Sequence, residues 1–209
     1  MQTLVLLGDS ILDNEPYTRP EPSTTTHLQR LLPDWEIRRL AQDGAGLADI
    51  SFQLRQLQAR PTVAVLSVGG NDAVEHIGLL EDRTASSRSV LRQLLDIADQ
   101  FALRYEAVAR AVRAHAERTV LCTIYEVQLE PPIFAQLARV PLGLLNDRII
   151  RIAGRLHADV LELRNICTDP ADFVLQIEPS ARGAQKIAHA IAGLINAAAP
   201  PTASRLFSD

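Results

Sequence analysis

The sequence predicts an α/β domain of three layers, α-β-α, with a five-stranded parallel sheet in the middle. Five short apolar runs, rich in β-branched residues, alternate with longer segments in which apolar residues recur with helical period. Parallel strands are joined by helical crossovers, so this alternation favours helices on both faces of one sheet. The strands are expected at residues 3–7, 36–41, 63–68, 119–124 and 160–163.

The segments between these strands carry the helical signals. The clearest lies at residues 89–115, where apolar residues recur three or four positions apart. A later helix is expected to begin near Pro141, because proline is favoured in the first turn, and a final helix is expected at residues 184–194. The length of 209 residues fits one domain, which we assign to residues 1–197, followed by a flexible tail at 198–209.

Composition narrows the class of protein. The net charge of −4, with both signs interspersed, argues against a nucleic-acid surface. No window reaches the roughly 20 apolar residues that cross a bilayer, and the first residues carry no leader signal, so we expect a cytoplasmic protein acting on a small molecule. Cys122 and Cys167 adjoin apolar runs and are expected to be buried rather than to form a disulfide or metal site. No cofactor is implied.

The loops after the strands are where a site is expected, because ligands of such sheets bind beyond the carboxyl ends of the strands. Ser10 follows the first strand, beside Gly8, and is a candidate nucleophile that a substrate can approach closely. Its own backbone N–H, the backbone N–H of Gly44 and the side-chain amide of Asn71 are candidate donors to an oxyanion. The alternative is that Ser10 is only a turn serine, a common role next to glycine.

Three sequence blocks on successive strand ends resemble the SGNH (GDSL-type) hydrolase family. They are Gly8-Asp9-Ser10, residues 43–49 (DGAGLAD) and Gly69-Gly70-Asn71-Asp72, and their order and spacing fit that family over about residues 1–195. The resemblance implies a flavodoxin-like sheet and hydrolysis of an ester through an acyl-enzyme. It also implies that Ser10 is the nucleophile and that Gly44 and Asn71 form the oxyanion hole.

The last block departs from the family pattern, which places an Asp three residues before a His. In this chain Leu175 and Glu178 occupy those two positions, so the usual acid–base pair is absent. Glu178 is a candidate base, although the reference pKa of Glu lies about two units below that of His. Its alternative role is to stabilise the N-terminal end of the following helix. His76, five residues after Asn71, is a second candidate base or else a solvated loop residue.

Three further residues near the same edge are candidates for substrate binding, namely Asp13, Tyr125 and Glu126. Turn formation is the alternative for Asp13, and core packing is the alternative for Tyr125. The sequence therefore predicts a serine esterase or related acyl hydrolase that acts on a small ester with a degenerate triad. The alternative is a catalytically inactive ligand-binding module. A phosphate-binding site is disfavoured, because the first loop has neither a phosphate-loop lysine nor a three-glycine fingerprint.

Overall fold

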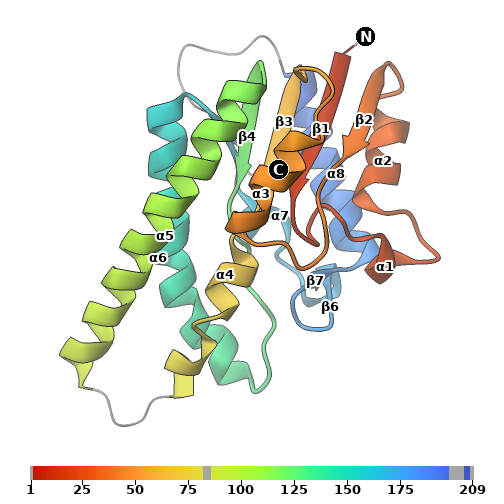
Figure 1. The fold of residues 1–209 in the computed structure, drawn as a ribbon. Helices are drawn as coiled ribbons and strands as arrows, with labels where there is room; N and C mark the ends of the chain where they lie inside the picture. The colour runs from red at the N-terminus through yellow and green to blue at the C-terminus, as the bar shows by residue number, and fades with distance from the viewer. Residues whose placement is uncertain (1, 82–85, 198–204, 208–209) are drawn as a thin grey trace.

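The computed structural model describes residues 2–81, 86–197 and 205–207, and these form the predicted three-layer α/β fold (Figure 1). The main sheet is parallel throughout, in the order β2-β1-β3-β4-β5-β8. Its strands are β1 (Gln2–Gly8), β2 (Trp35–Arg39), β3 (Val63–Ser67), β4 (Arg118–Cys122), β5 (Asp159–Leu161) and β8 (Leu206–Phe207). The strand order reverses between β1 and β3, and ligands of flavodoxin-like sheets bind at this switch point.

Each face of the sheet has its own apolar core, because successive side chains of a strand point to opposite faces. Leu4 and Leu6 of β1 pack in the cluster formed with helices α2 (Thr24–Leu31) and α8 (Ala181–Asn196). Val5 and Leu7 pack in the other cluster, which contains the apolar faces of α3, α5 and α6. These three helices are α3 (Ile50–Arg55), α5 (Ser87–His115) and α6 (Pro132–Leu156). The apolar run of β1 is therefore buried on both faces.

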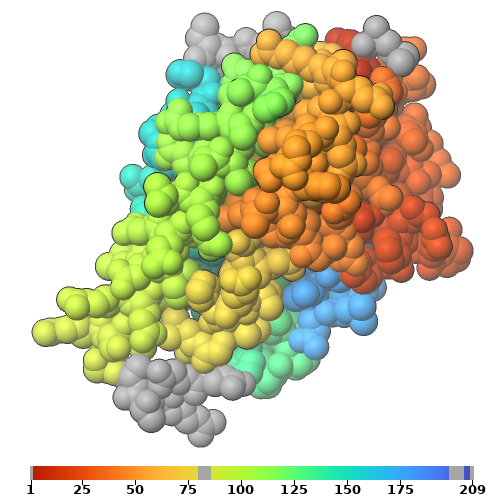
Figure 2. Space-filling view, in the orientation of Figure 1, coloured from red at the N-terminus to blue at the C-terminus, as the bar shows by residue number. Residues whose placement is uncertain are grey.

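Short elements surround the C-terminal edge of the sheet. They are α1 (Glu15–Thr18), η1 (Leu47–Asp49), α4 (Gly70–Val74), η2 (Ile77–Glu81), α7 (Leu163–Ile166), η3 (Pro170–Asp172) and the antiparallel pair β6 (Phe173–Val174) and β7 (Glu178–Pro179). On the molecular surface the segment of α4 and η2 lies between α5 and the β6–β7 hairpin (Figure 2). These loops bring segments that are far apart in the sequence to one end of the molecule.

Two expectations about the elements need correction. The sheet has a sixth strand, β8, which pairs with β5 within the segment expected to be a flexible tail. Residues 198–204 and 208–209 of that tail lie outside the described residues. The helix expected to begin near Pro141 begins at Pro132, and Pro141 lies inside it. The start signal is Pro131-Pro132, and the interior proline costs α6 only one backbone hydrogen bond, which packing of its apolar side can offset.

Two smaller expectations can also be compared with the structure. Cys122 and Cys167 are free and buried, as the sequence predicted. Within the described ranges, no helix combines the length and the apolar character that a membrane span requires. The division of the chain into a domain at 1–197 and a tail stays a prediction.

Candidate active site

The turn after β1 is held in one geometry by close backbone packing. Gly8 has a φ of +126°, and a Cβ atom there would lie 1.6 Å from the carbonyl oxygen of Ser67, so only glycine fits. The buried side chain of Gln53 accepts a hydrogen bond from the N–H of Gly8 and donates one to its carbonyl, both at 2.8 Å. The N–H of Asp9 donates to Ser67 at 3.0 Å. Ser10 therefore follows a rigid strand end.

Ser10 and Glu178 meet at the end of a cavity of about 600 Å³ that both residues line. Ser10 is 8% exposed, and its hydroxyl lies close enough to the carboxyl group of Glu178 to lower the pKa of that group. Among the described residues, the second carboxylate oxygen of Glu178, Oε2, is buried without a hydrogen-bond partner. Glu178, the candidate base, thus lies beside the candidate nucleophile and keeps one acceptor atom unused.

The surroundings of Glu178 raise the pKa of its carboxyl group relative to that of a glutamate in water. Burial raises the pKa of this carboxyl group above its usual value, the hydrogen bond from Ser10 lowers it, and the negative charge of Asp43 raises it again. A carboxylate with a raised pKa is a stronger base than glutamate in water. The shift therefore brings Glu178 closer to the proton affinity that a base for serine needs.

The hairpin β6–β7 and the start of α8 hold Glu178 at the cavity. The hydroxyl of Ser180 accepts a hydrogen bond from the N–H of Gly183 at 3.2 Å, which caps α8. A Cβ atom at Gly183 would lie 2.3 Å from the carbonyl oxygen of Asp172, so this glycine allows the helix to approach η3 closely. The Pro-Ser-x-x-Gly frame that follows Glu178 in the sequence therefore fixes the backbone from which its side chain projects.

The candidate oxyanion donors come from three strand ends. The Nδ2 group of Asn71 donates one hydrogen bond to the carbonyl oxygen of Ala45 at 2.9 Å, which leaves its second N–H for a ligand. That bond also ties Asn71 to the loop that carries Gly44. Within the part of the chain that the structure describes, the backbone N–H groups of Ser10 and Gly44 have no hydrogen-bond partner. Asn71 and Ser10 line the cavity, whereas Gly44 lies on the exposed loop beside it.

Asp13, expected near the substrate, contacts the Gly44 loop instead. Its carboxylate accepts hydrogen bonds from the Arg39 side chain and from the N–H of Asp43, the latter at 2.9 Å. The hydroxyl of Tyr17 donates to the Asp43 side chain at 2.6 Å. Asp13 does not line the cavity. The structure therefore favours the turn-forming alternative for Asp13, which braces the loop that presents the Gly44 N–H.

The remaining candidates divide between the cavity and the surface. Tyr125 lines the cavity, and its hydroxyl donates to the carbonyl oxygen of Ile177 at 2.5 Å, which joins this strand end to the β6–β7 hairpin. Glu126 forms an ion pair with Arg139 at 2.8 Å and does not line the cavity. Leu175 is 74% exposed at the hairpin turn. Its side chain thus lies in solvent, away from the buried position that an orienting acid would need.

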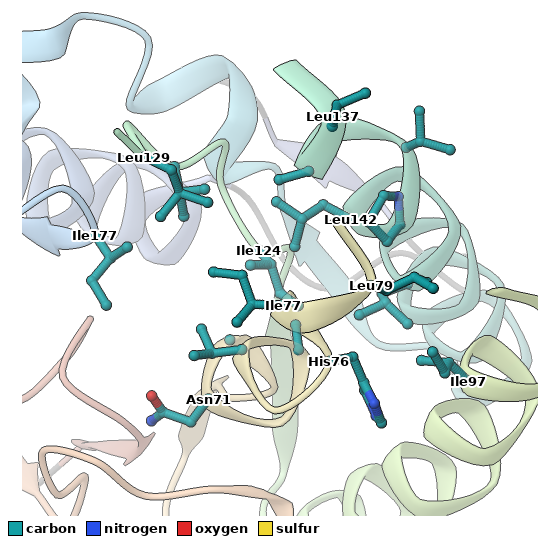
Figure 3. A pocket seen from close by; sticks show the side chains of 18 of the residues that line it. Asn71, His76, Ile77, Leu79, Ile97, Ile124, Leu129, Leu137, Leu142 and Ile177 are labelled. Atoms are coloured by element: carbon teal, nitrogen blue, oxygen red, sulfur yellow. The ribbon is translucent and has the colours of Figure 1, made fainter. Parts of the chain in front are cut away.

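His76 lies in the wall of the same cavity but in a different part of it. Figure 3 shows Asn71 and His76 projecting from one short helical segment in different directions, with the imidazole turned away from the amide. His76 also borders a second, smaller hollow together with residues of α5. Within the described ranges, nothing joins His76 to Ser10. The geometry therefore favours Glu178 over His76 as the candidate base.

Sequence reasoning missed the apolar wall of this cavity and the protonation of Asp9. Asp9 is 2% exposed, and burial raises its pKa to about 8, with the charge of Glu178 acting in the same direction. Its Oδ1 atom accepts a hydrogen bond from the N–H of Ile11 at 3.2 Å, which opposes the shift. Burial thus favours the neutral form of the carboxyl group directly before the candidate nucleophile.

This protonation predicts how stability depends on pH. Between about pH 4 and pH 8 the folded protein keeps a proton on Asp9 that the unfolded chain has lost, so the free energy of unfolding falls as the pH rises. Asp9→Asn removes this titration and keeps the acceptor for Ile11. We expect its gain in stability over the parent to be larger near pH 8 than near pH 5, by up to about 4 kcal/mol. Urea unfolding at both pH values, with the exposed Asp34→Asn as control, tests this, and identical pH slopes in the parent and Asp9→Asn would contradict it.

Comparison with known proteins concerns the family and the fold of the chain. The sequence pattern described as the GDSL-like lipase/acylhydrolase family matches residues 6–186. A search among curated protein sequences found no match. Among solved structures the protein is similar to phospholipase A1 from Streptomyces albidoflavus, with a TM-score of 0.70 and 14% identity over 94% of this chain and 99% of that one.

Two further solved structures have the same fold. An extracellular lipase from Streptomyces rimosus has a TM-score of 0.68 and 13% identity, over 95% of this chain and 100% of that one. An acetylxylan esterase from Geobacillus stearothermophilus has a TM-score of 0.64 and 16% identity, over 93% of this chain and 94% of that one. At these identities the likeness concerns the fold.

Proposed function

The chain belongs to the GDSL-like lipase/acylhydrolase family, and we propose that it is a serine esterase in which Glu178 replaces histidine as the base. The observation that carries this proposal is that Ser10 and the buried Glu178 line the same cavity, with the Ser10 hydroxyl close enough to the carboxyl group to lower its pKa. A nucleophile needs a base within hydrogen-bond reach, and the described residues offer Ser10 no other side-chain base. No cofactor is required for this chemistry.

The proposed reaction has two steps. In the first, the Glu178 carboxylate takes the hydroxyl proton of Ser10 as the Oγ atom attacks the carbonyl carbon of the ester. The negative charge that develops on the carbonyl oxygen is held by the N–H groups of Ser10 and Gly44 and by the free N–H of Asn71. Collapse of this intermediate breaks the ester bond, and Glu178 returns the proton to the leaving alcohol.

In the second step a water molecule attacks the acyl group on Ser10. Glu178 accepts a proton from this water, the bond between the acyl carbon and Oγ breaks, and Oγ regains the proton from Glu178. The products are one carboxylic acid and one alcohol for each ester and water consumed. Asp13 and Asp72 act indirectly, because their carboxylates accept hydrogen bonds from the N–H groups of Asp43 and Leu47 at the two ends of the Gly44 loop.

The competing function is a catalytically inactive ligand-binding module. It is favoured by one observation, the replacement of the usual acid by a solvent-exposed leucine at position 175. That reading requires saturable ligand binding, lost in Asn71→Ala, without turnover of short esters. Measurable turnover that depends on Ser10 excludes it. The cytoplasmic location expected from the first residues stays a prediction.

Covalent labelling tests the proposal directly. We expect a fluorophosphonate probe to modify the purified protein once, and mass spectrometry of the digested protein to place the adduct on Ser10. Ser87 also lines the cavity, at its far end, so Ser87→Ala is a matched control that should label as the parent does. The rate of p-nitrophenyl acetate hydrolysis should fall in proportion to the fraction of the protein that is labelled. Labelling at another residue, or turnover that survives complete labelling of Ser10, would refute the assignment.

A further inference from the structure

The cavity at Ser10 owes its shape to two helices that are longer than the sheet they cover. The 29 residues of α5 span about 43 Å, whereas the five residues of β3 span about 17 Å. Helix α6 is also long, with 25 residues. Both helices continue past the C-terminal edge of the sheet, where α4 lies beside them (Figure 1). The overhanging turns therefore cannot bury their apolar sides against strands.

The cavity lies between these overhanging turns. Its walls come from α4, η2, the first turns of α5, the first half of α6 and the strand end after β4 (Figure 3). Twelve of the lining side chains are Ile or Leu residues: Ile11, Ile77, Leu79, Leu91, Leu94, Ile97, Ile124, Leu129, Leu137, Leu142, Leu145 and Ile177. The polar lining residues gather around Ser10, except for His76 and Ser87. The cavity thus has a reactive polar end and a long apolar part, which we call the apolar pocket.

The apolar pocket combines a buried floor with an exposed rim. Leu142 and Leu145 of α6 form part of the floor and are buried. Leu91 of α5, by contrast, is 61% exposed while lining the same cavity, and Val140 and Ile77 are also exposed. Apolar side chains that line a concavity and remain open to water usually mark a ligand site. Because the pocket is continuous with the Ser10 end, its occupant is part of the molecule that reacts there.

We propose that the apolar pocket binds an unbranched acyl chain of medium to long length, whose carbonyl carbon lies at Ser10. This inference rests on the proposed function and names its substrate class. A cavity of about 600 Å³ is much larger than an acetyl group needs and lies within the range of sites for whole small molecules. Within the described residues, the apolar part presents no carboxylate, lysine or arginine to a polar acyl group. The proposed ester has a longer acyl part than the small ester expected from the sequence, and that expectation stays a prediction.

Chain-length dependence of hydrolysis is the first test. Each methylene that enters the pocket should raise kcat/KM by roughly threefold, until the pocket is full. We therefore expect p-nitrophenyl decanoate to be preferred over the acetate by at least about a hundredfold, measured below the concentration at which the esters form micelles. Equal kcat/KM values for acetate, hexanoate and decanoate would overturn the inference and leave the proposed function in place.

A matched pair of surface variants tests whether the acyl chain of the substrate binds in the apolar pocket. Leu91 and Leu103 are both exposed on α5, at 61% and 77%, but only Leu91 lines the cavity. Leu91→Ser should raise KM for the decanoate about three- to tenfold. Leu103→Ser should leave the KM for the decanoate and the hydrolysis of the acetate unchanged. Neither exposed substitution is expected to disturb folding, so equal effects of the two variants would count against the pocket.

A blocking variant and a binding measurement separate this inference from the proposed function. Ala138 is buried in the pocket wall, whereas Ala135 of the same helix does not line it. Ala138→Phe, compared with Ala135→Phe, should abolish the preference for the decanoate and the saturable binding of the fluorescent fatty acid cis-parinaric acid. Binding that Ala138→Phe abolishes, without any ester hydrolysis, would support the pocket while the proposed function fails. Absence of saturable binding to the parent protein would overturn the pocket assignment.

Discussion

Ser10→Ala is expected to lower kcat/KM for short p-nitrophenyl esters by about 10³- to 10⁶-fold. The reason is that the proposed reaction forms the acyl-enzyme on the Oγ atom, and among the described residues no other hydroxyl shifts the pKa of the buried Glu178. The substitution removes only the hydroxyl group of Ser10, a residue that is 8% exposed, so the fold should stay intact. Steady-state kinetics together with thermal unfolding of the variant measure both quantities.

The control for this prediction is the other serine of the cavity. Ser87→Ala should retain the activity of the parent, because Ser87 lies at the start of α5 and away from Glu178. Residual activity of Ser10→Ala within tenfold of the parent would show that the serine is not the nucleophile. Unchanged thermal unfolding is required for either result to be interpreted.

Glu178→Gln is the second large effect, with an expected fall in kcat of about 10²- to 10⁴-fold. The amide keeps the volume of the carboxyl group and still accepts the hydrogen bond from Ser10, but it cannot take up a proton. Since the two residues act as one unit, Ser10→Ala combined with Glu178→Gln should be little worse than Ser10→Ala alone. Additive losses in the double variant would contradict a shared role.

The pH profile identifies the base independently of the size of the loss. Glu178 must be ionised to accept the proton, so kcat/KM should be low at acid pH, rise through the raised pKa of this group and then level off. Glu178→His should retain activity, and the pH at which kcat/KM rises should move toward the reference pKa of histidine, about 6.5. Glu126→Gln is the control, because Glu126 is paired with Arg139 outside the cavity. If kcat/KM rose at the same pH in the parent and in Glu178→His, Glu178 would be excluded as the base.

The positions of the candidate nucleophile and of the candidate oxyanion donors could be predicted because their signals are local. Ser10 lies two residues after β1 and Asn71 four residues after β3, and parallel strands carry their C-terminal ends to one edge. The Pro-Ser-x-x-Gly frame after Glu178 is local as well, since it caps and seats the next helix. For such residues the sequence spacing and the strand periodicity suffice to predict the place in the fold.

Other features depended on contacts between distant segments. Whether Glu178 or His76 meets Ser10 is decided by the hairpin β6–β7, which Tyr125 holds to the end of β4 through the Ile177 carbonyl. The sixth strand, at residues 206–207, exists because β5 has a free edge at which to pair. Neither pairing leaves a periodic signal in the sequence.

The sequence by itself determined the three-layer α/β architecture, the position of Ser10 at the switch point and the absence of the usual acid–base pair. These follow from hydrophobic period, strand order and residue identity, all of which are properties of the chain read in one direction. The tertiary structure alone decided that Glu178 contacts Ser10 and that α5 and α6 enclose an apolar pocket beyond the sheet. The pocket depends on the length of the helices relative to the strands. The position of Glu178 depends on loop packing, which brings together side chains more than a hundred residues apart.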